Sequence, residues 1–242
     1  MNAIEIQGLT KRYGKLTAVD HLNLNIPQGE LFALLGVNGA GKSTTIRMLS
    51  TLCSPTEGDA ALLGYHLSSH ATAIKSIIGV SPQETAIAPN LTAQENLEFL
   101  CGIHGLSKLQ SEERIAALTQ QFSLQSILSR KAGKLSGGWQ RRLSIAMALI
   151  NQPTILFLDE PTLGLDVLAR AELWDVIRSL KGKTTIILTT HYMEEAEALS
   201  DRIGIMKDGR LLIVGTANEI KAMTGKDKFD EAFVSIIREV RV

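Results

Sequence analysis

The segment "LFALLGVNGAGKSTTIRMLS" (residues 31–50) constrains the fold more than any other stretch of this sequence. An apolar run leads into Gly36-x-x-x-x-Gly41-Lys42-Ser43, and a run compatible with a helix follows. In this strand–loop–helix context the glycines let backbone N–H groups wrap phosphate oxygens, and the helix N-terminus adds a positive dipole. Lys42 can reach the β and γ phosphates, and Ser43 can ligate Mg²⁺. The segment therefore predicts a phosphate-binding loop rather than a Gly-rich turn with an exposed lysine.

Short apolar runs rich in Val, Ile and Leu recur along the chain and alternate with helical patterns, which predicts an α/β fold with a largely parallel, buried sheet. These runs lie at residues 3–6, 31–35, 77–80, 155–158, 185–189 and 203–206. Between about residues 84 and 152 the alternation stops, and Thr92-x-x-Glu95 and Ser107-x-x-Gln110 are typical capping boxes of two helices. We therefore expect a helical subdomain inserted into an α/β core.

The C-terminal part of the chain predicts a hairpin followed by helices. Two apolar runs flank Asp208-Gly209, which is a strong signal for a tight β-turn. Thr216-x-x-Glu219 then predicts the start of a helix, and the tail "KFDEAFVSIIREVRV" has charged and apolar residues at helical spacing.

The composition is that of a folded globular protein: 45% of the 242 residues are hydrophobic. Lys plus Arg equals Asp plus Glu at 25 each, so no overall field attracts nucleic acid, and we expect no nucleic-acid partner. Cys53 and Cys101 lack metal-ligand spacing and are expected to be small buried residues in a reducing compartment. No secretory signal is visible, and no apolar run approaches the roughly 20 residues that span a bilayer. If this protein serves a membrane, another chain must cross it.

Two further apolar strands end in residues that suit phosphate chemistry. In "TILFLDEPTLGLD" the predicted strand ends at Asp159, which is placed to hold the Mg²⁺ shell. Glu160 follows and is placed to accept a proton from an attacking water. The alternative is a surface Asp-Glu pair that caps the next segment. His191 closes "TTIILTTH"; a lone His is often structural, but α/β sheets bind ligands at this end of their strands.

The stretch "LSGGWQRR" (residues 135–142) has the small residues of a second nucleotide contact, far from the phosphate loop. A serine followed by two glycines leaves backbone N–H groups open to an anion, but the same residues also suit an ordinary turn. By itself the stretch leaves both interpretations open.

Together these motifs resemble the nucleotide-binding subunit of ATP-binding cassette (ABC) transporters, over nearly the whole chain. "GVNGAGKST" resembles the Walker A loop, Gln83 the Q-loop, "LSGGWQRR" the family signature, "ILFLDE" Walker B, "LGLD" the D-loop and His191 the H-loop. The first is the most specific, and the order and spacing of all six strengthen the resemblance. It implies a P-loop NTPase core with a mostly parallel sheet, an N-terminal antiparallel β part and an inserted α-helical subdomain.

The resemblance also implies individual roles. Tyr13 would stack on adenine, although a turn tyrosine with an apolar body is the alternative. Gln83 would contact Mg²⁺ or the attacking water, Glu160 would be the general base, His191 would contact the γ-phosphate, and Asp166 would organise the interface between two subunits. The expected catalytic residues are Glu160, His191, Gln83 and Lys42. The expected nucleotide-binding residues are Tyr13, Gly36, Asn38, Gly39, Gly41, Lys42, Ser43, Thr44, Ser136, Gly137, Gly138 and Asp166. The expected metal ligands are Ser43, Gln83 and Asp159.

On the same resemblance we expect an ATPase domain at 1–220, with its core at 1–83 and 153–215, a helical subdomain at about 84–152 and a helical tail at 221–242. The implied cofactors are ATP and Mg²⁺. The implied partners are a second ABC ATPase subunit, identical or a close paralogue, and transmembrane permease subunits, with the protein peripheral at the cytoplasmic face of the cell membrane.

Several stretches narrow the function within this family. "EPTLGLD" and "LTAQENLEF" look most like bacterial subunits that serve exporters, including multidrug exporters, although importer subunits share the core motifs. Two different functions also stay open: a soluble ABC ATPase that acts outside transport, and a regulatory module that does not hydrolyse ATP. Two departures stand out: Trp139 replaces the common Gln of the signature, and Val167 replaces a frequent Pro. We expect Trp139 to alter packing or interface contacts before catalysis.

Overall fold

The computed structural model describes residues 1–239, which form two compact units. The first unit joins Met1–Lys75 to the residues from Lys181 onward, and the second unit is Ser76–Leu180. Residues 240–242, the end of the predicted helical tail, lie outside the described part of the chain.

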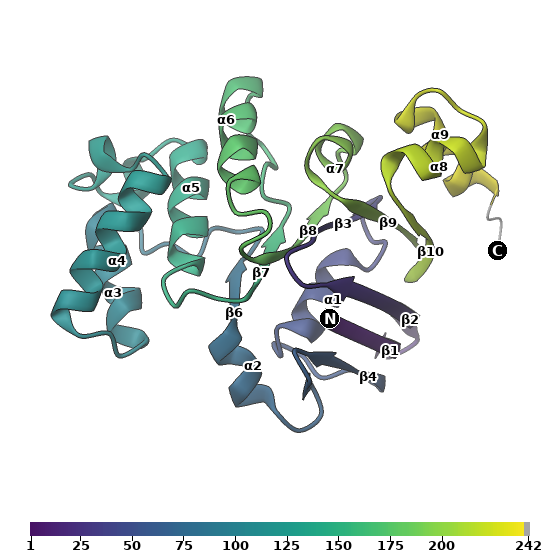
Figure 1. The fold of residues 1–242 in the computed structure, drawn as a ribbon, viewed down its shortest axis with the longest axis horizontal. Helices are drawn as coiled ribbons and strands as arrows, with labels where there is room; N and C mark the ends of the chain where they lie inside the picture. The colour runs from purple at the N-terminus through teal and green to yellow at the C-terminus, as the bar shows by residue number, and fades with distance from the viewer. Residues whose placement is uncertain (240–242) are drawn as a thin grey trace. The chain divides into compact units, whose positions relative to one another are not determined.

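The first unit contains an antiparallel sheet in the order β2-β1-β4-β5 (Figure 1). Its strands are β1 (Asn2–Tyr13), β2 (Leu16–Pro27), β4 (Glu57–Leu62) and β5 (Tyr65–His66). In β2, buried Leu22, Leu24 and Ile26 alternate with exposed polar residues, which is the pattern of a strand with one face on a core. This sheet is the predicted N-terminal antiparallel part.

The same unit contains a parallel set of strands that carries the phosphate loop. β3 (Leu31–Gly36) lies between β8 (Thr185–Thr190) and β9 (Arg202–Lys207) and is parallel to both. Every residue of β3 and β8 is buried, which explains their continuous apolar pattern. β10 (Arg210–Gly215) pairs antiparallel with β9 across the predicted Asp208-Gly209 turn.

The helices of the first unit follow its strands in the chain. They are α1 (Lys42–Leu49), α7 (Met193–Leu199), α8 (Ala217–Thr224) and α9 (Phe229–Glu239), and α2 (Ala71–Ile77) crosses the boundary between the units in sequence. Thr216 and Glu219 form the predicted capping box of α8. Among residues 1–239, no helix combines the length and apolar character that crossing a membrane requires.

The second unit is mainly helical and contains one parallel strand pair, β6 (Ile78–Ser81) with β7 (Ile155–Asp159). Its α-helices are α3 (Ala93–Ile103), α4 (Lys108–Gln121), α5 (Gly137–Ala148) and α6 (Val167–Arg178), and its 3₁₀ turns are Gln125–Ile127 and Ala132–Lys134. Both predicted capping boxes are present, and α3 packs against α4 and α5 (Figure 1).

The fold class predicted from the sequence is confirmed. Five of the six apolar runs lie within strands, and the run at 77–80 lies in β6 except for Ile77, the last residue of α2. The parallel pairs, the antiparallel N-terminal sheet and the helical region between residues 84 and 152 are present. The predicted domain boundaries stay a prediction.

Candidate nucleotide site

The phosphate loop connects β3 to α1 directly. The strand ends at Gly36, the helix begins at Lys42, and Asn38 and Gly39 lie exposed between them. Gly41, the N-cap of α1, has a φ of 102°, where side chains are strained, and a Cβ there would lie 2.4 Å from the carbonyl oxygen of Ala18. The loop therefore needs glycine at position 41 both for its backbone turn and for its contact with β2.

Lys42 is buried, with an exposed fraction of 5%, although it carries a charge. Its ammonium donates hydrogen bonds to the carbonyl oxygens of Gly36 at 2.7 Å and Val37 at 3.3 Å. A buried lysine needs such partners because desolvation of an unpaired charge is costly. Ser43 and Thr44 follow in the first turn of α1 and are half-buried. The loop itself thus holds a positive charge at the helix N-terminus, where the helix dipole also favours an anion.

His191 and the phosphate loop lie at the same edge of the parallel strands. β8 pairs with β3 so that Thr190 lies opposite Leu35, and His191 follows Thr190 as Gly36 follows Leu35. His191 is half-buried, and its ring centroid lies 4.1 Å from that of Tyr192. Within the first unit, the phosphate loop and His191 therefore begin at the ends of neighbouring strands.

Tyr13 ends β1 and is 45% exposed. The ammonium of Lys11 lies 5.1 Å from the centre of its ring, and its hydroxyl lies 4.0 Å from Sγ of Cys53. Partial burial, followed by the influence of Cys53, raises the pKa of the Tyr13 phenol. An exposed aromatic ring in the unit that carries the phosphate loop can offer a surface for a base.

In the second unit, Gln83 and the two acidic residues follow neighbouring parallel strands. Ser81, near the end of β6, lies opposite Leu158 in β7, so Gln83 and Asp159 belong to adjacent strand ends. Gln83 is exposed, whereas Asp159 and Glu160 are buried. These residues occupy the edge at which parallel sheets bind ligands.

Glu160 lies one residue beyond β7, so the alternation of side chains along a strand does not set the direction of its side chain. Its φ of 49° lies in the left-handed region, which is uncommon for a residue with a side chain. Its carbonyl oxygen accepts a hydrogen bond from the N–H of Leu163 in the following turn. Such backbone strain persists where the surroundings enforce it, and it gathers at functional sites.

The signature stretch begins α5. Ser136 is the N-cap of this helix and is exposed, but its hydroxyl makes no capping hydrogen bond. At the corresponding positions of α3, α4 and α8, the Thr or Ser side chain accepts the usual bond from the third helical residue. Gly137 and Gly138 form the first turn of α5. Ser136 thus differs from these three N-caps, because its hydroxyl does not cap its helix.

Two other residues singled out in the sequence have structural partners. Asp166 is the N-cap of α6, and its carboxylate accepts a 2.9 Å hydrogen bond from the N–H of Ala169. Trp139 lies 5.0 Å from the guanidinium of Arg142, which also pairs with Glu172. The departure at Trp139 is therefore accommodated by a cation–π contact inside the second unit.

Arg141 is a functional candidate that the sequence argument missed. It lies in α5, is 5% exposed, and donates hydrogen bonds of 2.6 Å to the carbonyl oxygens of Pro82 and Gln83. The buried guanidinium thus ties the signature helix to the segment of Gln83. The only signal was its place within "LSGGWQRR", because backbone acceptors about 60 residues away have no sequence pattern.

The oxygen donors of the predicted metal ligands fit Mg²⁺ in kind: a hydroxyl from Ser43, an amide from Gln83 and a carboxylate from Asp159. Among the described residues, no cluster of three or more His, Cys, Asp or Glu could hold a metal.

The comparisons with known proteins agree on one family. The sequence profile of the family described as "ABC transporter" matches residues 19–163. The probable multidrug ABC transporter ATP-binding protein YbhF of Escherichia coli (strain K12) is 40% identical over 242 residues, covering 98% of this chain and 42% of YbhF. The daunorubicin resistance ATP-binding protein DrrA3 of Streptomyces coeruleorubidus is 43% identical over 229 residues, covering 94% of this chain and 72% of DrrA3.

A solved structure that is similar to this chain is also an ATP-binding cassette. It is the dimeric structure of a post-hydrolysis state of the ATP-binding cassette MJ0796 bound to ADP and Pi. The TM-score is 0.79 at 29% identity, over 88% of this chain and 98% of that chain.

The fold and the loop between β3 and α1 define a P-loop nucleotide-binding protein. The match to the family profile and to DrrA3 places it more narrowly: the chain belongs to the ABC transporter family. The resemblance drawn from the motifs is thereby confirmed. The chain spans 42% of the length of YbhF and 72% of that of DrrA3.

Proposed function

We propose that this chain is the ATP-hydrolysing subunit of an ABC transporter, which dimerises around two ATP molecules and powers export through separate membrane subunits. One observation carries the proposal. The segment that matches the family, residues 19–163, contains the phosphate loop, Gln83, the signature serine and the Asp159-Glu160 pair together.

In the hydrolytic site, Lys42 and the loop amides bind the β and γ phosphates. Glu160 accepts a proton from the attacking water, and His191 contacts the γ-phosphate. Ser43, Gln83 and Asp159 would hold Mg²⁺, which when bound neutralises phosphate charge and orients the γ-phosphate. Tyr13 supplies the surface on which adenine stacks. The observed placement of the loop and His191 at neighbouring strand ends supports this assignment.

The signature residues act on the nucleotide of a second subunit. The hydroxyl of Ser136 and the first amides of α5 are directed to the γ-phosphate held by the partner subunit's loop, and Asp166 lies at the interface. The absence of a capping bond from Ser136 supports this role, and the related cassette MJ0796 forms a dimer in its structure bound to ADP and Pi. ATP then favours the closed dimer because it contacts both subunits only in that state.

The transport role rests on the relatives. YbhF is described as a probable multidrug transporter protein and DrrA3 as a daunorubicin resistance protein, so export is favoured over import. The subunit would lie peripherally at the cytoplasmic face of the cell membrane and bind transmembrane permease subunits, which select the transported compound.

An ATPase assay with and without Mg²⁺ tests the enzymatic part of this proposal. We expect release of phosphate from ATP that requires Mg²⁺. The rate per protein molecule should increase with protein concentration, because the active form is a dimer. No phosphate release, either by the chain alone or with its membrane subunits, would exclude an ATPase and favour a regulatory ATP-binding module.

Replacing the signature serine distinguishes ATP-driven dimerisation from ATP binding to the monomer. We expect Ser136→Glu to abolish ATP-driven dimerisation, because its carboxylate would repel the γ-phosphate. ATP binding to the monomer should change by less than about twofold, as for a surface substitution. Light scattering and ATP titration measure these two properties, and Ser129→Glu, at an exposed serine of the same unit, is the control. If Ser136→Glu weakened ATP binding to the monomer as strongly as dimerisation, Ser136 would belong to its own chain's pocket.

A further inference from the structure

The turn at Asp208-Gly209, between β9 and β10, contacts the phosphate loop directly. The N–H of Gly209 donates a 3.1 Å hydrogen bond to the carbonyl oxygen of Ala40, the residue before Gly41. The carbonyl oxygen of Gly209 in turn accepts a 2.9 Å hydrogen bond from the N–H of Asp20 in β2. One peptide segment of the turn therefore joins the loop to the antiparallel sheet.

Glycine is required at position 209 for two reasons. Its φ is 80°, and a Cβ there would lie 3.0 Å from the carbonyl oxygen of Ala18. That same oxygen would lie 2.4 Å from a Cβ on Gly41. Ala18 thus lies against both the turn and the loop, and a Cβ at Gly41 or Gly209 would crowd its carbonyl oxygen.

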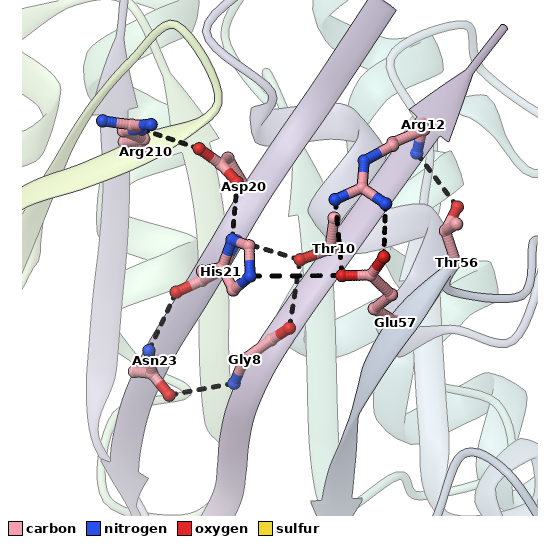
Figure 2. A network of polar contacts seen from close by, with 9 residues as sticks. All are labelled: Gly8, Thr10, Arg12, Asp20, His21, Asn23, Thr56, Glu57 and Arg210. Atoms are coloured by element: carbon pink, nitrogen blue, oxygen red, sulfur yellow. Dashed lines mark hydrogen bonds and ion pairs between the residues drawn. The ribbon is translucent and has the colours of Figure 1, made fainter.

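An ion pair fixes the outer side of the turn. Nε of Arg210 donates to the carboxylate of Asp20 at 2.7 Å, and Nδ1 of His21 lies 2.6 Å from the same carboxylate. These contacts, His21 first and then Arg210, lower the pKa of the Asp20 carboxyl. Figure 2 shows how the contacts continue through His21 to Glu57, which pairs with Arg12.

We propose that Gly209, supported by the Asp20–Arg210 pair, is a positioning residue for the phosphate loop, which it holds through Ala40 in the conformation that binds nucleotide. The proposal rests on the proposed function, because it assumes that ATP is the ligand of the loop. Gly209 would act through Ala40 and not by binding the nucleotide itself.

Gly209 would act on the loop through the Ala40 peptide. Its carbonyl accepts a hydrogen bond from Gly209, and the next residue, Gly41, adopts the left-handed backbone at which the helix begins. A displacement of the turn by a few tenths of an ångström would lengthen the Gly209–Ala40 bond and let the Ala40–Gly41 peptide rotate. The amides that surround the phosphates would then no longer converge, and ordering them again would reduce the affinity for ATP.

The test compares Gly209→Ala with Gly64→Ala. Gly64 has nearly the same φ, 84°, but a Cβ there would meet nothing within 4 Å, so this control reproduces the backbone strain without the contact. We expect Gly209→Ala to raise the Kd for ATP by about tenfold, as for the loss of one well-placed hydrogen bond. Gly64→Ala should leave the Kd within about twofold of the unsubstituted protein.

A second arm uses amide hydrogen exchange without nucleotide, and it includes Arg210→Met in case Gly209→Ala does not fold. We expect faster exchange in residues 36–45 for both variants, because their local opening becomes less costly. The control Arg178→Met, which removes a 2.8 Å ion pair with Asp175 in the second unit, should leave that segment unchanged.

Each result is decisive. Equal ATP affinity in Gly209→Ala and Gly64→Ala, with normal binding by the unsubstituted protein, would overturn the positioning role and leave the proposed function intact. If the unsubstituted protein bound no ATP, the proposed function would fail. Independently of that result, unchanged exchange in residues 36–45 of both variants would overturn the positioning role of Gly209.

Discussion

Replacing Glu160 by Gln is expected to reduce ATP hydrolysis by about 10²–10⁴-fold, the usual contribution of a positioned general base. Glutamine keeps the size of the side chain but accepts no proton from the attacking water. Because ATP is bound and not consumed, we expect the variant to accumulate as an ATP-bound dimer. Phosphate release and gel filtration in saturating ATP measure the two effects.

The buried position of Glu160 makes the choice of substitution important. Glutamine retains one oxygen acceptor and adds no volume, so the strained turn after β7 should persist. Glu113→Gln, at an exposed position of α4, is the matched control and should hydrolyse ATP normally. A Glu160→Gln protein that stayed monomeric in saturating ATP would argue against the dimer that encloses two nucleotides.

Lys42→Ala should weaken the binding of ATP by about 100-fold, or about 2.7 kcal/mol. This is the expected size for losing a hydrogen-bonded charge that meets the phosphates. Adenosine, which has no phosphates, should bind equally to both proteins. Titration with the two ligands measures the difference, and Lys108→Ala, at a side chain that is 92% exposed, is the control.

The main risk in this experiment is a general loss of folding, because Lys42 also bonds to the carbonyl oxygens of Gly36 and Val37. Thermal unfolding without nucleotide should therefore be measured in parallel. A Lys42→Ala protein that folds and binds ATP as tightly as the unsubstituted chain would show that the loop is not the phosphate site.

Much of the fold could be predicted from the sequence because its strands are short, apolar and buried on both faces. The runs of β3, β7 and β8 have this character, and their boundaries were found to within a residue. The helices that begin at Thr92, Ser107 and Thr216 were also predictable, since a capping box lies within four consecutive residues.

What escaped prediction depends on residues far apart in the chain. The backbone of Glu160 is left-handed, and nothing in "LDEP" signals it. The bonds of Arg141 to Pro82 and Gln83, and that of Gly209 to Ala40, join segments separated by tens to more than a hundred residues. The sequence identified the Asp208-Gly209 turn correctly but could not show which segment it would touch.

The two bonds of Arg141 have a mechanical consequence. Pulling Gln83 away from α5 would strand a buried guanidinium without these acceptors, at a cost of about 1.5–3 kcal/mol for each bond. Small movements of the Gln83 segment are therefore cheaper when the helix travels with it. The two hydrogen bonds of Arg141 thus couple any movement of the Gln83 segment to α5.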